Sequence, residues 1–566
     1  MNSQEAVFHE TDCKGLLENF PALENAQLAE LAAAQQIALP LPVLHAYQTV
    51  CRSQGKRTVT GEELRFLDQL AKAFRNTPDA YLMAAMTTDN DAVAETLADL
   101  MKRRSDEQKE APHPPSLSAM TAWMDDWASA HMDIPANDDV AVCFPPHRDL
   151  QLAVRGYRRS ASTGDRDHDV SIGAPLSDRN KTPITKGDYV YAILPDEADT
   201  ERIDRLSDLL ISHAVLSSVK SAKIVRNQCI FPLLLEWDCG MIVHGQKLIA
   251  NADATIADTA NAVFGAVIVA SPERSADLLL EAQEQGLPLV CLAKITDSDT
   301  LILRMDHGEY RFPTAFLRSL ALRTVFEADL SLPEEETVCV SLSRLGTCTL
   351  RDKRHALVKT DAAGTPSFRA AILGITYGLA HCVAVGASIR EAQLFTQLIL
   401  PLASASKARF SEAVGSILGL YRMQAEFALW GKPEIEVTHE ETPALSSVLL
   451  APLPAKIPSA TATRHGTNIY YLEPLYTKDG IPDFADLKQL FFYVMHLIAD
   501  GKAYAVRPTK TDLSAELKTM GTEISITPVG NATTVRIGGF LIETDHPIQG
   551  ILVGKTENPE KNEADS

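Results

Sequence analysis

Two residues of opposite charge stand one residue apart in the segment Val358-Lys359-Thr360-Asp361, where an apolar run gives way to a loop. The ammonium group of Lys359 could pair with phosphate oxygens, and the carboxylate of Asp361 could hold a divalent metal on them. The segment therefore carries a candidate phosphate or metal site at the end of a strand. The alternative is an ordinary strand-to-loop exit with exposed charges, and we favour that interpretation.

A second group of residues has the types that bind metal ions, namely Asp165, Asp167, His168 and Asp169. They lie within residues 155–186, a stretch rich in turn formers and without periodicity, which predicts a loop. Adjacent residues rarely all point at one ion. We therefore favour a solvated acidic loop over a metal site.

The sequence GILVGKT at 550–556 invites comparison with a phosphate-binding loop. Its spacing is one residue shorter than that of the P-loop, and no helix follows that could present its N-terminus to a phosphate. We predict a β-strand there instead. The G-x-S-x-G pattern of a nucleophile elbow is absent, and no cysteine or serine stands beside a local base.

The element expected to position the charged pair is a helix that follows it. This helix begins after the start signal at 365–367 and ends at Gly386, and its apolar residues recur at three- and four-residue steps. Gly374 and Gly378 keep the helix slim, although each costs roughly 0.5–1 kcal/mol relative to alanine. We therefore expect the helix to pack closely against a sheet.

The 566-residue chain has a formal net charge of −21, with 45% hydrophobic and 22% charged residues. Its length is sufficient for about three or four domains, each with its own core. The negative charge argues against nucleic-acid binding, because nucleic acid requires a clustered basic surface. The nine cysteines form no C-x-x-C pair, which favours reduced thiols.

The N-terminus lacks the charged and then apolar pattern of a signal peptide. No apolar run approaches the roughly 18–20 residues that a membrane helix needs. We therefore expect a cytoplasmic protein that binds neither membrane nor nucleic acid.

The order of the predicted elements indicates the fold class. Residues 14–108 carry periodic apolar positions and are predicted to be helical throughout, with Thr60 at an N-cap and Glu63 at the capping-box position. Within 186–330, and again from 468 to the end, apolar strands alternate with helices. This order predicts an α/β (α+β) multidomain protein.

Three blocks in the C-terminal half resemble one enzyme family, in the same order. They are residues 366–387, then residues 393–397 (QLFTQ) with a helix at 410–429 that ends in Trp430-Gly431-Lys432, and then residues 479–484 (DGIPDF). These blocks resemble the second synthetase half of the long phosphoribosylformylglycinamidine (FGAM) synthases. That family makes an amidine from an amide with ATP and glutamine in purine biosynthesis.

The resemblance implies an aminoimidazole ribonucleotide (AIR) synthase-like fold. It also implies that Gln397 and Lys432 lie near Lys359 and Asp361, so that these four side chains would form a nucleotide-binding site. The cofactors implied in this way are ATP and Mg²⁺.

Positions that the family uses for catalysis carry other residues in this chain. Residues 54–68 resemble the family's linker, but continuing the alignment puts Phe74 where the family keeps its functional histidine. Tyr377 takes the place of a glutamate inside the central helix, and Pro433-Glu434 replace an Asp-Ser pair. The family's substrate-binding segment Glu-Thr-His-Asn-His-Pro is absent. Together these departures imply that the family reaction has been lost.

The element pattern and the resemblance together predict the domain organisation. The predicted segments are a helical N-terminal and linker domain (1–110), a linker and loop region (111–185), an AIR synthase-like C-terminal-type domain (186–330), an AIR synthase-like N-terminal-type domain (331–456), a second AIR synthase-like C-terminal-type domain (457–556) and a disordered tail (557–566). In this prediction the chain is a truncated, degenerate relative of the long FGAM synthases and lacks their glutaminase domain.

Our first hypothesis is an FGAM synthase-like protein without catalysis, which acts as a binding, scaffold or regulatory protein. Its partner would be a separate glutaminase or another purine-pathway enzyme, and the chain would be a monomer or a homodimer. The alternative is an active ATP-dependent amidine-forming synthetase that takes ammonia from solution or from a separate glutaminase. An apolar plug around Tyr377 and Phe74 would contradict that alternative. A third hypothesis is a plain interaction protein with no ligand.

Overall fold

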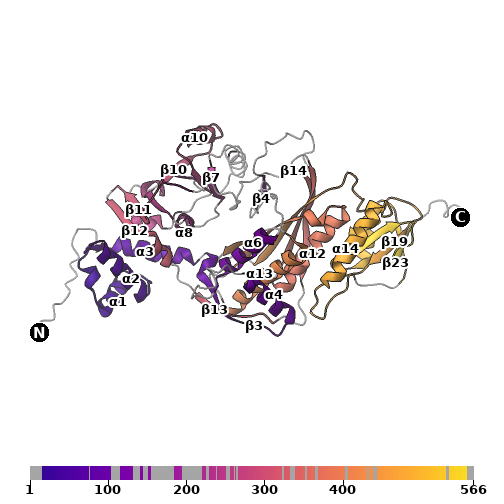
Figure 1. The fold of residues 1–566 in the computed structure, drawn as a ribbon, viewed down its shortest axis with the longest axis horizontal. Coiled ribbons are helices and arrows are strands. Elements are labelled where there is room, and N and C mark those ends of the chain that lie inside the picture. The colour runs from indigo at the N-terminus through magenta and orange to yellow at the C-terminus, as the bar shows by residue number, and fades with distance from the viewer. Residues whose placement is uncertain are drawn as a thin grey trace. The chain divides into compact units, whose positions relative to one another are not determined.

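The computed structural model shows the chain as two compact units of helices and sheets (Figure 1). The residues that it describes are 16–75, 77–103, 115–131, 140–143, 151–154, 184–193, 209, 219–224, 229–237, 239–249, 255–260, 262, 266–273, 275–306, 308–320, 324–331, 338–350, 353–363, 367–401, 406–429, 433–437, 443–510, 512–530 and 535–557. Predictions for Lys432, the acidic loop at 165–169 and the tail beyond 557 concern residues outside this set.

The first unit comprises the described residues within 1–80, 136–161 and 171–324. Its N-terminal helices are α1 (Asn25–Ala34), α2 (Leu41–Ser53) and α3 (Gly61–Phe74). The capping box predicted for α3 is confirmed, because Thr60 Oγ1 accepts a hydrogen bond from the Glu63 amide at 3.1 Å and Glu63 Oε2 accepts one from the Thr60 amide at 2.9 Å.

A seven-stranded sheet follows these helices in the first unit. Across the sheet its strands are β12 (Gly308–Pro313), β11 (Thr300–Met305), β8 (Gly240–His244), β10 (Leu289–Thr296), β6 (Tyr189–Ile193), β9 (Ala266–Ala270) and β7 (Val219–Ile224). Neighbouring strands are antiparallel except β8 and β11. β11 and β12 form a hairpin, in which Met305 pairs with Gly308.

The core of the first unit lies on both faces of this sheet. On β9, Val267 belongs to one apolar cluster and Ile268 to another, as expected for alternating side chains. Helix α8 (Ile230–Glu236) contributes to the first cluster, and α10 (Ser275–Glu284) contributes to the second.

The shorter elements of this unit are β1 (Leu16–Leu17), η1 (Phe20–Ala22), β2 (Val59–Thr60), η2 (Pro78–Ala80), β4 (Val140–Cys143), β5 (Gln151–Val154), η4 (Gly245–Lys247), α9 (Ile256–Thr259) and α11 (Thr314–Ser319).

A strand interrupts the region predicted to be helical throughout. Residues Tyr81–Thr87 form β3, which pairs with β13 (Thr324–Asp329), and the Leu330 amide donates to the Thr87 carbonyl at 2.8 Å. The partner strand is supplied from far along the chain, so no local pattern could have revealed the pairing. Helix α4 (Asp91–Lys102) agrees with the prediction, and α6 (Leu117–His131) lies beyond the region predicted to be helical.

Helix α12 (Phe368–Ala384) is the buried centre of the second unit, which comprises the described residues within 81–135, 162–170 and 325–566. All 17 residues of the helix are buried. Ser367 Oγ accepts a hydrogen bond from the Ala370 amide at 3.0 Å at its start. Gly386 ends it with a φ of 76°, a left-handed conformation that glycine adopts without strain. Both predicted ends are therefore confirmed.

A five-stranded sheet covers one side of α12 and a second helix covers another. The strands, in order, are β14 (Cys339–Leu350), β15 (Lys353–Ala363), β18 (Ala444–Pro452), β16 (Gln393–Leu400), which follows η5 (Ile389–Glu391), and β17 (Pro433–Val437). The predicted close approach is confirmed, because a Cβ atom on Gly378 would lie 2.8 Å from Leu449 Cδ1. On the helix side, α13 (Lys407–Phe427) packs against α12, and Tyr421 of α13 donates to Asp99 of α4 at 2.6 Å.

A second five-stranded sheet completes this unit. Its order is β20 (Ala505–Pro508), β22 (Phe540–Thr544), β19 (Asn468–Leu472), β23 (Ile551–Thr556) and β21 (Ile526–Pro528), with helices α14 (Phe484–Ala499) and α15 (Leu513–Met520). Residues 551–556 thus form the predicted strand and not a phosphate loop.

Glu543, on β22 of this sheet, is fully buried, and its carboxylate accepts hydrogen bonds from Thr463, Arg464 and Thr467. Among the described residues, no helix combines the length and the apolarity that a bilayer crossing requires.

The contact between α12 and α13 predicts opposite effects for two glycine-to-alanine substitutions. A Cβ atom on Gly419 would lie 2.5 Å from the Phe368 carbonyl oxygen and 2.8 Å from Ala371 Cβ. We expect Gly419→Ala to lower the free energy of unfolding by about 1–3 kcal/mol, because the helices must separate. A Cβ atom on Gly374 would meet only Ala362 Cβ at 3.9 Å. Gly374→Ala is the matched control and should raise stability by about 0.5–1 kcal/mol, because alanine favours the helix.

Urea unfolding monitored by circular dichroism measures both effects. Equal destabilisation by the two substitutions would contradict the close approach of α12 and α13.

Candidate functional site

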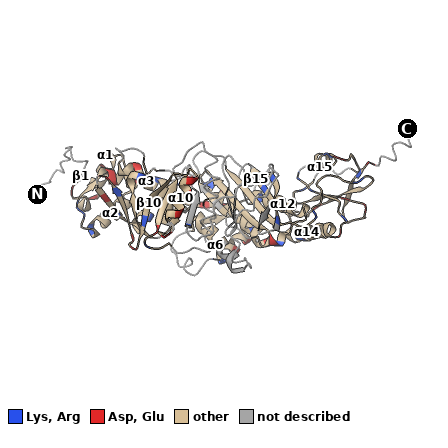
Figure 2. Cartoon of the chain, turned by 90° about the horizontal axis from the view of Figure 1, so that it is seen from above, with Lys and Arg blue, Asp and Glu red and all other residues tan. Residues whose placement is uncertain are grey.

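The charged pair predicted from the sequence lies on one face of the five-stranded sheet. Thr360 Oγ1 donates to the Gly374 carbonyl of α12 at 3.1 Å, so Thr360 faces the helix. Side chains alternate along a strand, so Lys359 and Asp361 point to the opposite face. In Figure 2 blue segments mark Lys and Arg on β15, within a region that is mostly tan.

Three of the four predicted site residues come together on this face. The register places Asp361 opposite Ser446 on β18, and Ser446 opposite Gln397 on β16. Residues directly opposite one another in a sheet share a face. Ser446 Oγ donates to Asp361 Oδ1 at 2.5 Å, and Gln397 is 5% exposed. The fourth predicted residue, Lys432, lies outside the described residues.

Ser446 is the member of this row that sequence reasoning did not identify. Its position beside Asp361 depends on the pairing of two strands, and the two residues are 85 positions apart in the sequence. Strand register is set by tertiary packing, which a local pattern does not reveal.

Lys359 and Asp361 form a loose ion pair, with Lys359 Nζ 3.7 Å from Asp361 Oδ1. Their side chains are 24% and 30% exposed, so solvent can reach both. An exposed pair of this kind contributes at most about 1 kcal/mol to stability. A ligand that contacts Lys359 or Asp361 could therefore replace this ion pair at little cost in stability.

Asp361 is a carboxylate on this face that could take part in binding a metal ion, and the register places Glu434 of β17 opposite Gln397 in the same row. Among the described residues, no group of three or more His, Cys, Asp or Glu side chains is arranged to hold one. Mg²⁺ commonly binds through one or two carboxylates together with substrate phosphates. The arrangement is therefore suited to a metal ion that arrives with a nucleotide.

On α12, Tyr377 occupies the position where the resemblance implies a catalytic glutamate. Its side chain is 7% exposed and belongs to an apolar cluster with Val340, Leu373 and Ile537. Burial, with the nearby charge of Glu516 adding to it, raises the pKa of Tyr377 to about 12. The phenol therefore stays neutral and fills this position with apolar surface.

Phe74, where the resemblance implies a histidine, is also part of an apolar core. The side chain is 7% exposed and lies in the cluster that includes Leu70 and Ala71 of the same helix. Neither of the two substituted positions presents the carboxylate or the imidazole that the resemblance implies there.

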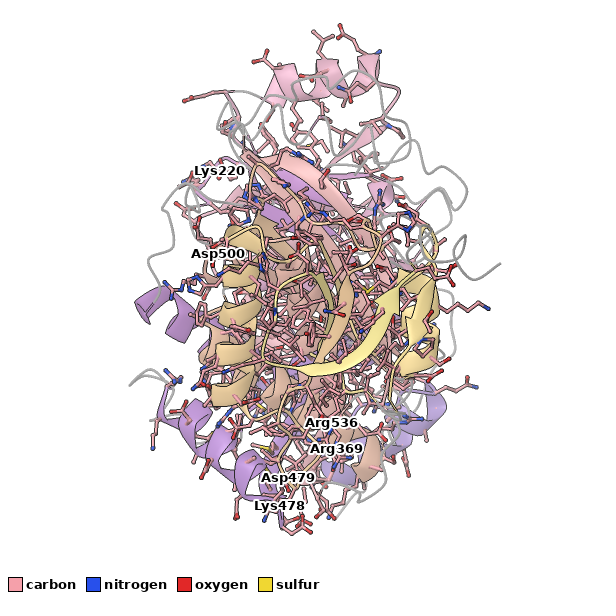
Figure 3. All side chains as sticks on the ribbon, turned by 90° about the vertical axis from the view of Figure 1, so that its right-hand side faces the viewer. Lys220, Arg369, Lys478, Asp479, Asp500 and Arg536 are labelled. Atoms are coloured by element: carbon pink, nitrogen blue, oxygen red, sulfur yellow. The ribbon has the colours of Figure 1, made fainter. Side chains whose placement is uncertain are left out.

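Two of the blocks that carry the family resemblance meet at the start of α12. Arg369 Nε donates to the Asp479 carbonyl at 2.9 Å, and both residues are labelled in Figure 3. A Cβ atom on Gly480 would lie 3.2 Å from Arg369 Nε. The block at 479–484 thus packs against the helix of the first block.

His381 lies one turn beyond Tyr377 on α12. The centroids of the two rings are 4.6 Å apart in an edge-to-face arrangement. Burial, helped by the positive charge of Arg507 on β20, lowers the pKa of His381 to about 3. The imidazole is therefore neutral at physiological pH.

No protein-family model matches this sequence, and no curated protein matches it. Among solved structures, phosphoribosylformylglycinamidine synthase II of Thermotoga maritima matches with 11% identity and a TM-score of 0.48, covering 69% of this chain and 73% of that chain. The complex of T. maritima PurL with ATP matches with 11% identity and a TM-score of 0.49, covering 69% and 72%. Thiamine monophosphate kinase of Aquifex aeolicus matches with 14% identity and a TM-score of 0.28, covering 38% and 88%. At TM-scores below 0.5 this likeness does not by itself assign a function to the chain.

The burial of His381 predicts a specific pH dependence of stability. In the unfolded chain its pKa returns to about 6.5, whereas the folded state takes up the proton only near about pH 3. Between these values the unfolded state binds more protons, so stability falls as the pH drops below about 6.5 and is unaffected above it. Replacing His381 by Gln should flatten this fall, because the side chain that takes up the proton on unfolding is gone.

The measurement compares urea unfolding at about pH 7.5 with that at about pH 5, where a histidine that stays neutral when folded costs on the order of 2 kcal/mol. His496→Gln on α14 is the control, since its exposed ring is in contact with water in both states. An unchanged pH dependence in His381→Gln would contradict the buried, neutral imidazole.

Proposed function

We propose that this chain is a non-catalytic, FGAM synthase-like protein that binds a nucleotide and acts as a scaffold or regulatory protein linked to purine biosynthesis. The nucleotide would be ATP with Mg²⁺, on the sheet face that carries Lys359, Asp361 and Gln397. The observation that carries the proposal is the apolar cluster around Tyr377, at the position where the family resemblance implies a glutamate.

The loss of catalysis is supported by what a phosphoryl-transfer site requires. Such a site holds divalent metal on the phosphates through carboxylates and stabilises the charge that develops on them. At position 377 the side chain is a neutral phenol packed against Leu373 and Ile537. Restoring a carboxylate there would require burying a charge in apolar surroundings, which is strongly unfavourable.

Nucleotide binding is supported by the polar row on the opposite face of the sheet. Lys359 supplies a cation for phosphate oxygens, and Asp361 supplies a carboxylate for the metal ion that accompanies them. Ser446 holds the Asp361 carboxylate in place through a hydrogen bond of 2.5 Å. Binding a metal–nucleotide complex through Asp361 does not require the complete set of ligands that catalysis needs.

The proposed partner is a separate glutaminase or another purine-pathway enzyme, and the proposed location is the cytoplasm. A protein that keeps a nucleotide site but not the chemistry can report nucleotide concentration to a partner, because ligand binding stabilises one conformation over others. Both parts rest on the sequence resemblance, and copurification from cells of the source organism tests the partner.

Titration calorimetry with ATP tests the nucleotide site, with and without Mg²⁺. We expect binding with a dissociation constant on the order of 1 μM, about −8 kcal/mol, in the presence of Mg²⁺. Asp361→Ala should weaken it at least about tenfold with Mg²⁺ and have little effect in EDTA, because the carboxylate acts through the metal ion. Lys359→Met should weaken binding under both conditions, because the ammonium group contacts phosphate directly.

The control is Asp500→Ala, which removes an exposed carboxylate that pairs with Lys502. Heat equal to the dilution blank at about 1 mM ATP would contradict the nucleotide site. Release of ADP that depends on ammonia and on the family's amide substrate, and that is lost in Asp361→Ala, would instead establish the alternative, an active amidine-forming synthetase.

A further inference from the structure

One face of the seven-stranded sheet in the first unit keeps an accessible area on β8 and β11. Met241 and Leu303 lie in the core shared with α2 and α3, so their neighbours Ile242 and Ile302 point to the opposite face. Towards the other end of the sheet, α10 supplies Leu278 to the second apolar cluster (Figure 1). Ile242 and Ile302 belong to neither cluster, and both are only partly buried. This part of the face is therefore available for contact.

Basic residues stand on both sides of these two isoleucines. Strand register places Lys294 of β10 beside Ile242, and Arg311 of β12 beside Ile302. Ile242 and Ile302 are themselves neighbours in the pairing of β8 with β11. Strands of a sheet lie about 4.8 Å apart, so the backbones that carry the two cations are about 14 Å apart. The row is thus an apolar centre with an exposed cation at each end.

A second row next to the first adds further positive charge. Strand pairing places Arg304 of β11 beside His244 of β8 and opposite Glu309 of β12. Glu309 pairs with Arg304 Nε at 2.6 Å and with Arg311 at 3.2 Å, so two guanidinium groups share one carboxylate. Burial, with the charges of Lys247 and Arg304 adding to it, lowers the pKa of His244, so this ring is neutral at physiological pH.

Lys247 of η4 extends the positive charge towards β10. Its Nζ atom donates to the Cys291 carbonyl oxygen of that strand at 3.0 Å, and the residue is exposed. Glu309 is the one acidic residue on β8, β10, β11 and β12, although the chain as a whole has a formal net charge of −21. Other acidic residues nearby lie in the turns at the strand ends, namely Asp297, Asp299 and Asp306. The four cations with the two isoleucines between them form the basic strip: Lys247, Lys294, Arg304, Arg311, Ile242 and Ile302.

An acidic helix already packs on the adjacent part of the same face. Helix α10 carries Asp277, Glu281 and Glu284 and no basic residue, and its Leu278 faces the sheet. A helix with its side chains is about 10–12 Å across, which is slightly less than the about 14 Å between the outer cations of the strip. A second helix of this kind would therefore fit on the isoleucines with a cation along each flank.

We propose that the basic strip is a docking site for an acidic amphipathic helix of a partner protein. The helix would place its apolar stripe on Ile242 and Ile302 and its carboxylates against the cations on both sides. The aliphatic centre favours a protein helix over a nucleic acid, because isoleucine offers neither the aromatic stacking nor the hydrogen bonds through which proteins hold bases.

This surface goes beyond the proposed function and is separate from the proposed nucleotide site. The basic strip belongs to the first unit, whereas Lys359, Asp361 and Gln397 belong to the second. Asp361→Ala should therefore leave docking unchanged, and either proposal can fail without the other.

Fluorescence anisotropy of a labelled peptide mixed with the full chain tests docking. The probe is a synthetic helix of about 20 residues with leucines along one stripe and glutamates on both sides of it. The control peptide has the same composition in an order that spreads the leucines around the helix. At about 50 mM salt we expect a dissociation constant on the order of 100 μM for the probe and at least about tenfold weaker binding of the control. Binding of the probe should weaken as salt is added.

Variants of the chain locate the site. Lys294→Glu combined with Arg311→Glu should weaken the probe at least about tenfold, because repulsion replaces attraction on both flanks. Ile302→Asp should weaken it as well, because the apolar contact is lost. Lys407→Glu combined with Lys502→Glu is the matched control, since it changes two exposed cations of the second unit and should leave the affinity unchanged.

The proposal is overturned if the two peptides bind equally, since the apolar stripe would then play no part, or if neither binds at about 1 mM. It is also overturned if the double variant Lys294→Glu and Arg311→Glu keeps the affinity of the unmodified chain. A single-stranded DNA of about 20 nucleotides that displaces the probe at a lower concentration than the unlabelled peptide would overturn it in favour of nucleic-acid binding. The unmodified chain gives the comparison of the peptides even if a variant does not fold.

Discussion

The complete burial of α12 is the constraint on which the second unit depends. A helix with no exposed face must be covered on every side, and here the five-stranded sheet, α13, α14 and β20 all pack against it. Gly378 and Gly419 allow this, since a side chain at either position would collide with Leu449 or with the Phe368 backbone. Close packing of this kind transmits small changes, because interiors are dense and adjust poorly.

Burial also decides which of the polar groups near α12 can take part in chemistry. On the helix, Tyr377 is held neutral and His381 cannot take up a proton at physiological pH. On the far face of the sheet, Lys359 and Asp361 form an ion pair and keep partial contact with water. The buried polar groups Tyr377 and His381 thus lie on the helix side of this layer, and the partly exposed ion pair lies on the other.

Nonlocal contacts attach the N-terminal helices of the second unit to this layer. β3 pairs with β13, and Tyr421 of α13 donates to Asp99 of α4. Glu543 has a comparable role in the C-terminal sheet, where its buried carboxylate accepts donors from Thr463 to Thr467. Each contact satisfies a polar group that would otherwise be buried alone, so each also fixes the path of the chain.

The sequence by itself determined the local features: both ends of α12, the capping box of α3, the strand at 551–556 and the mixed α/β class. These features depend on residue types at fixed short spacings, such as Ser367 before the helix and Gly386 after it. Such spacings can be read directly from the sequence. Only the tertiary structure decided that Ser446 lies between Asp361 and Gln397 and that β3 finds its partner in β13. These depend on strand register and on the packing of distant elements, which are set by the shape of the whole core and not by any local pattern.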